Sequence, residues 1–348
     1  MNHPFCMHAL LACCGAEIPT DTDCFRQLAR FHYTGAVAGL RVVLSDRNLK
    51  SQWVVAMLTI MMLCIYERAK PKGSPGIEIH LVGAARLIEF HSRDSLIYGQ
   101  LSQAEQAMHR LVRESYIFHV ATSLPFQHSD AHHDEIEMAL SLSEQAICQH
   151  FRPHLLSHPD SPVLGFPPYL FRCIYTVYRL YQSSRNKHIT SQKCRKLDDD
   201  LRQWDRCTRP QTSKNTTANN QANLETAWTG PRLYILGCRI LLRQISGSEL
   251  AEVDPKIDHL IEEGMGIVRR LEPATDYYAD YYCWPFLAIG LHLRSTSDRE
   301  LLMDQVLAFR AATNNGTMRR LEDMLELIWQ SRHAQSMAPA TPASNQTG

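Results

Sequence analysis

Apolar residues recur at helical spacing in segment after segment of this 348-residue sequence, and no segment alternates apolar and polar residues between hairpin turns. Short breaks separate the helical segments, as at 70–76, where two prolines and two glycines stop a helix. Helices without strands must bury their apolar faces against one another. The pattern therefore predicts an all-α fold, a single large domain of packed antiparallel helices.

The segment 77–91 shows the helical pattern most clearly. Its apolar residues fall on one face, and its charged residues lie on the others, where Glu89 and Arg93 are spaced to pair at i and i+4. Glycine at position 83 costs a helix interior roughly 1 kcal/mol relative to alanine. Because Ala84 follows Gly83, we expect a neighbouring helix to cross closely at this point.

An earlier amphipathic helix is predicted to begin at an aspartate, at position 21 or 23. Large apolar side chains at helical spacing normally face a core. The expected buried row of this helix is Phe25, Leu28, Phe31 or His32, Val37 and Leu40.

The domain limits follow from composition. We expect one helical domain over 1–332, interrupted by a flexible insertion at about 208–222, where Thr, Asn and Ser replace apolar residues. The Pro-, Ser- and Thr-rich segment 333–348 is predicted to be a disordered tail. The apolar run 53–66 is shorter than the roughly 20 residues that span a bilayer, so no membrane segment is predicted.

Charge and cysteine usage narrow the function classes. Lys+Arg and Asp+Glu number 36 each, so no global field draws the chain to nucleic acid, and any DNA contact must be local. The 11 cysteines are odd in number, and no two are spaced as Cys-x-x-Cys. We interpret them as reduced, mostly buried thiols.

Two acidic or histidine-rich segments look like metal sites at first. His128, His132 and His133 include an i, i+4 pair, but they lie at a loop-to-helix boundary without a defined further ligand, so a solvated helix cap is preferred. The three consecutive aspartates within 197–204 point in different directions and cannot together hold a diphosphate through magnesium. They are interpreted as an exposed helix start, and no catalytic residue, metal ligand or cofactor is predicted.

Two other segments could bind something. A run of cations without an acid could contact phosphate or act as a nuclear import signal; the plainer alternative is a solvated loop and first turn, neutralised by the following aspartates. Aromatic residues crowd 277–284, where core packing or the lining of a ligand pocket is favoured over base stacking. The cations are Arg185, Lys187, Lys193, Arg195 and Lys196.

Several short motifs, in order along residues 5–332, resemble the fungal-specific regulatory domain that follows a binuclear zinc cluster in many fungal transcription factors. The closest match is His80-Leu-Val-Gly-Ala84 followed by Leu87-Ile88. The others are Ala9–Ala12, Tyr33–Leu44, Tyr66-Glu67, Trp284–Gly290, Asp298-Arg299, Ile328-Trp329 and Arg332.

The resemblance implies a nuclear transcriptional regulator, not an enzyme, that controls a metabolic or secondary-metabolite gene cluster through partners or a bound effector. The zinc module, with its two Cys-x-x-Cys pairs, does not occur in these residues, so it was either lost or lies in an upstream exon. Expected partners are the transcription machinery or another DNA-binding regulator, with direct DNA contact and a homodimer left open. The alternative is an all-α small-molecule binder or enzyme with an aromatic-lined pocket.

Overall fold

The computed structural model describes residues 3–18, 23–45, 49–70, 76–93, 101–123, 132–150, 161, 163–165, 167–182, 187–208, 218–246, 255–273, 279–313 and 316–337. Within these ranges every regular element is an α-helix, which confirms the all-α prediction. The helices are α1 (Pro4–Glu17), α2 (Asp23–Ser45), α3 (Leu49–Ala69), α4 (Gly76–Ser92), α5 (Gln103–Ser123), α6 (His133–His150), α7 (Pro168–Gln182), α8 (Lys187–Thr208), α9 (Ala218–Ser246), α10 (Pro255–Val268), α11 (Ala279–Gly290), α12 (Thr296–Thr313) and α13 (Gly316–Met337).

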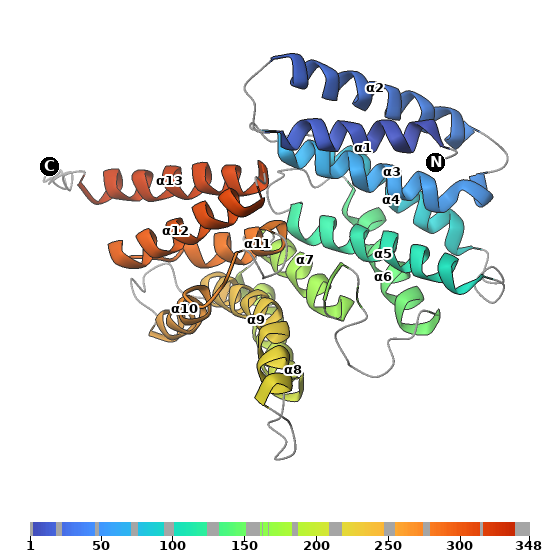
Figure 1. Ribbon diagram of the computed structural model, residues 1–348. Helices are drawn as coiled ribbons and strands as arrows, with labels where there is room; N and C mark the ends of the chain where they lie inside the picture. Colours follow the sequence, from blue (N-terminus) through green and yellow to red (C-terminus); the bar gives the residue numbers. More distant parts are fainter. Residues whose placement is uncertain are drawn as a thin grey trace, which may run out of the picture.

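The helices pack as a succession of antiparallel layers (Figure 1). Helices α1 and α2 form the outermost layer at one end, and α8 and α9 extend to the other. A series of contacting helices, α3, α5, α7, α9 and α11, runs between them, and one apolar core extends from Phe5 to Leu325. The end of α1 also meets the start of α13, because the Glu17 carboxylate accepts the Gly316 N–H, the first amide of α13, at 2.9 Å.

Local sequence signals explain where several helices begin. Proline occupies the first position of α1, α7 and α10, where its missing N–H costs no hydrogen bond. Helix α5 begins with a capping box, in which the Glu105 N–H donates to Ser102 Oγ at 3.3 Å and the Ser102 N–H donates to Glu105 Oε2 at 2.8 Å. The expected Arg93–Glu89 pair on α4 forms at 2.8 Å.

Helix α3 is longer than the apolar run 53–66. By length and composition it is the one helix among the described residues that could cross a membrane. It contacts α1, α4 and α5, and half of its most apolar window is buried inside the domain. This is the environment of a core helix.

The predicted insertion and tail fall partly on described helices. Helix α8 ends at Thr208 and α9 begins at Ala218, so only 209–217 of the predicted insertion lie outside the described residues. Helix α13 continues to Met337, and 338–348 lie outside the described residues.

The close crossing expected at Gly83 is not there. A Cβ atom built at this position would have no neighbour within 4 Å, whereas Ala84 next to it is fully buried. The small residue that faces the core is therefore Ala84, and Gly83 turns toward open space.

Gly83→Ala is consequently expected to raise the free energy of unfolding by about 0.5–1 kcal/mol, because alanine restricts the unfolded chain and fits the helix without a clash. Urea denaturation followed by circular dichroism measures this change. A loss of stability would show that a neighbour does approach Gly83.

Candidate functional site

The basic run lies on and before helix α8. Lys193, Arg195 and Lys196 are exposed on this helix. Lys187 is its first residue, and Arg185 lies outside the described residues. Three of the five predicted cations are therefore accessible to a partner.

The aspartates that follow do not start a helix, which corrects the sequence interpretation. Asp198 lies in the middle of α8, is 8% exposed, and accepts hydrogen bonds from three arginines. The donors are Arg202 at 2.8 Å, Arg239 at 2.9 Å and Arg243 at 3.2 Å. This carboxylate holds α8 against α9, so it is engaged by these arginines rather than by the preceding basic run.

The histidine cluster does not converge on one point. His132 Nδ1 lies 3.2 Å from Glu135 Oε1, and His133 Nδ1 lies 2.9 Å from the Tyr175 hydroxyl. His128 lies outside the described residues. Among the described residues, no group of three or more His, Cys, Asp or Glu side chains is arranged to hold a metal ion.

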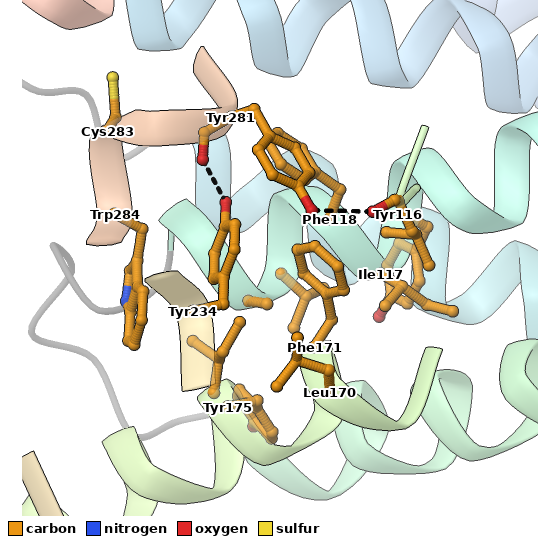
Figure 2. Packing of buried hydrophobic residues seen from close by; sticks show 14 of the residues in the cluster. Tyr116, Ile117, Phe118, Leu170, Phe171, Tyr175, Tyr234, Tyr281, Cys283 and Trp284 are labelled. Carbon is orange, nitrogen blue, oxygen red and sulfur yellow. Dashed lines mark hydrogen bonds between the residues drawn. The ribbon is translucent and has the colours of Figure 1, made fainter. Parts of the chain in front are cut away.

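The aromatic patch belongs to the core (Figure 2). Tyr281 is 1% exposed, its carbonyl accepts the Tyr234 hydroxyl at 2.6 Å, and Trp284 stacks on Tyr234 at 5.5 Å between ring centroids. Tyr277 and Tyr278 lie outside the described residues. The described rings pack against one another in the core; Cys283, on the same helix, points away from them.

Helices α1 and α2 approach closely, and three residues of the predicted buried row of α2 are on its outer face instead. A Cβ atom on Gly39 would lie 2.5 Å from the Phe5 Cβ, and one on Gly15 would lie 2.9 Å from the Ala29 Cβ. Small residues fit at such points, and the buried face of α2 carries Ala29 and Ala36 together with Leu40 and Val43. Leu40 is buried and Val37 packs against the core, as predicted, but Phe25, Leu28 and Phe31 are exposed.

Leu28 and Phe31 belong to an exposed apolar surface that we call the α1–α2 face. On α2 it consists of Cys24, Leu28, Phe31, Ala38 and Val42, all exposed, with Phe31 at 66% and Val42 at 72%. Their spacing follows a heptad row, the pattern of a helix that pairs with another helix. Among the described residues no helix covers this row.

The surface continues onto α1. Met7, Leu11, Cys14 and Ile18 form a parallel exposed row. A contact between His8 and His32, whose Nδ1 atoms lie 2.8 Å apart, joins the two helices. Eight of the 14 described large apolar side chains that are exposed lie within residues 1–45, so the accessible apolar area is concentrated here.

A second feature is buried where α3, α5, α11 and α13 meet. Arg68 is 3% exposed and donates to His119 Nδ1 at 3.2 Å and to Thr122 Oγ1 at 3.1 Å. It pairs with Asp280 Oδ2 at 3.4 Å, and its carbonyl accepts from Arg320 at 3.0 Å. We call these five residues the Arg68 junction; a small cavity opens beside it.

Acid is expected to weaken the domain through its buried histidines. Burial first, and a neighbouring arginine second, lowers the pKa of His119 well below 6.5 and the pKa values of His109 and His292 to about 4. The unfolded chain then binds protons that the folded chain does not, so the free energy of unfolding falls as pH falls from 6.5 to about 4.

Urea unfolding at several pH values across this window measures the slope. His292→Gln should flatten it, whereas His132→Gln, at a half-exposed surface side chain, serves as the control. An unchanged slope in His292→Gln would contradict the assignment.

Comparison with known proteins gives one match. The model of a family described as fungal specific transcription factor domain matches residues 1–338. No curated protein and no solved structure matches the chain. The match includes every helix on which the motifs read from the sequence lie.

Proposed function

We propose that this chain, which belongs to the fungal specific transcription factor domain family, regulates transcription by docking a protein partner on its α1–α2 face. The family is one of transcription regulators rather than enzymes, and its role is nuclear. The 348 residues contain no Cys-x-x-Cys pair, so zinc-cluster DNA reading is not available within them. A partner that itself binds DNA would supply that step.

The single observation that carries the proposal is the exposed heptad row of the α1–α2 face. Burying apolar side chains such as Phe31 and Val42 stabilises a complex by about 1.5–3 kcal/mol each. A row of this spacing fits the apolar stripe of one further helix.

The charges beside the row indicate what kind of partner helix it binds. Arg30 and Arg41 are exposed on α2 and lie along one edge of the row by helical spacing. The acidic residues on the two helices are Asp23, at the start of α2, and Glu17, whose carboxylate is bonded to Gly316. The edge is therefore basic, and the complementary partner is an amphipathic helix with acidic flanks.

A double substitution tests the docking surface. Phe31→Glu with Val42→Glu places two carboxylates in the heptad row and should abolish binding of a synthetic helix with leucine at its a and d positions and glutamate beside them, measured by fluorescence anisotropy. Leu327→Glu is the matched control, because Leu327 is 65% exposed but lies on α13. Equal binding by the double variant and wild type would overturn the proposal, as would exclusive self-association of the chain in sedimentation.

The regulatory role is tested in the fungus. Deletion of the gene should change the transcripts of a group of neighbouring metabolic or secondary-metabolite genes, and the double variant should reproduce that change at normal protein level. A deletion strain with an unaltered transcriptome would exclude the regulatory function.

We further propose that the basic run on α8 directs nuclear import. Replacing Lys193, Arg195 and Lys196 with glutamine should shift a fluorescent fusion from the nucleus to the cytoplasm. The matched control is Lys256→Gln, at an exposed position on α10. Normal nuclear accumulation of the triple variant would refute this role.

A further inference from the structure

The cavity beside the Arg68 junction has an unusual lining. It has a volume of about 30 Å³ and lies between α3, α4, α5, α11 and α13. Its polar lining consists of two arginines and three hydroxyl side chains, and no carboxylate is among the described residues that line it. These are Arg68, Arg320, Thr122, Ser123 and Thr317.

One of the hydroxyls lacks a protein partner. Ser123 is 3% exposed, and its Oγ atom makes no hydrogen bond to the described residues. Buried hydroxyl groups are almost always hydrogen-bonded, because an unmade bond costs the desolvation of the group. The Thr122 hydroxyl, by contrast, already donates to the Phe118 carbonyl at 2.7 Å. Ser123 is therefore the lining group left to bind something in the cavity.

Arg320 is the second incomplete group. Its guanidinium donates to the Arg68 carbonyl, and it forms no ion pair with the carboxylates of the described residues. Arg68 is balanced by Asp280, so Arg320 adds a cation that the lining does not neutralise. Burial, and then repulsion from Arg68, lowers the pKa of Arg320, and the smaller opposing effects of Cys283 and Asp280 do not offset them.

We propose that this cavity binds a small carboxylate of the size of formate. Its carboxylate group would lie between Arg320, Arg68 and Ser123, because guanidinium groups bind carboxylates through charge-assisted hydrogen bonds. The volume of about 30 Å³ exceeds the roughly 10–15 Å³ that one water needs, so it admits a carboxylate group but no alkyl chain. The rest of the cavity wall consists of Ile77, Cys283, Leu321 and Met324.

Such a ligand would connect helices that lie far apart in the sequence. Ser123 and Arg68 belong to α5 and α3, whereas Arg320 and Leu321 belong to α13. A bound carboxylate would hold these helices together and act as a metabolite effector of the regulator. Binding itself does not depend on the α1–α2 face, so a failure here leaves the docking proposal standing.

Ligand-detected NMR on the full chain provides the test, with formate as the probe and formamide as its neutral analogue at matched ionic strength. Wild type should bind formate saturably and formamide at least tenfold more weakly. Arg320→Gln should abolish binding, and Arg319→Gln, an exposed neighbour outside the cavity, should not. Ser123→Ala should weaken binding by about fivefold, the effect of one lost hydrogen bond.

Ser123→Ala keeps the test decisive if Arg320→Gln does not fold, since it removes one unpartnered oxygen and leaves every charge in place. Saturable formate binding that both Arg319→Gln and a folded Arg320→Gln retain would overturn the proposal. Binding of inorganic phosphate without formate, or no saturable binding by wild type, would also overturn it.

Discussion

Arg68→Met is expected to lower the free energy of unfolding by about 3–5 kcal/mol, because it leaves a buried carboxylate unpaired. Asp280 is 7% exposed, and its Oδ1 atom has no hydrogen-bond partner among the described residues, so the Arg68 pair is its main compensation. The same change removes the donor to His119 and Thr122. Urea denaturation followed by circular dichroism measures the loss.

Two further variants separate the buried charge from other effects. Arg68→Met combined with Asp280→Asn should recover part of the lost stability, because no charge then remains unpaired. Arg93→Met is the control; Arg93 pairs with Glu89 at an exposed site, where such pairs contribute about 0–1 kcal/mol. If Arg68→Met cost no more than Arg93→Met, the junction would be solvated and the proposed role of Arg68 wrong.

Gly39→Ala is expected to lower the free energy of unfolding by about 1–3 kcal/mol, the usual cost of overpacking, even though alanine favours helices. The new Cβ would lie 2.5 Å from the Phe5 Cβ, an atom that no rotamer change can move, so α1 and α2 must separate. The same movement would distort the α1–α2 face.

Gly83→Ala and Gly266→Ala are the matched controls, since a Cβ atom at either position meets nothing within 4 Å. Thermal and urea unfolding should show a lower free energy of unfolding for Gly39→Ala and a higher one for the two control variants. Stabilisation by Gly39→Ala would show that the contact between α1 and α2 is looser than described.

Helix positions could be predicted because each helix carries its own apolar row, and that information is local. Helix orientation could not always be predicted from the same rows. For α2, side-chain size favoured Phe31 on the buried face, whereas the close approach of α1 favours small residues there, such as Ala29 and Ala36. The exposed heptad row was nevertheless present in the sequence, as apolar residues three, four or seven positions apart from Cys24 to Val42.

The charged groups that matter were missed because their partners lie far along the chain. Asp198 is bonded to Arg239 and Arg243, which belong to the next helix. Arg68 draws its partners from α5, α11 and α13. A single sequence gives no signal for such distant pairs, so the Arg68 junction and its cavity could only be found in three dimensions.

The contact between the first and last helices also determines the order in which this protein can fold during synthesis. Helices α1, α2 and α3 are neighbours in the chain and can pack soon after they leave the ribosome. Their partners on α13 come much later in the chain. Gly316, whose N–H donates to Glu17, follows it by 299 residues, and Arg320, which donates to the Arg68 carbonyl, follows Arg68 by 252 residues. The early helices therefore keep polar and apolar surface uncovered until α13 is translated, and such exposed surface makes folding intermediates prone to aggregation.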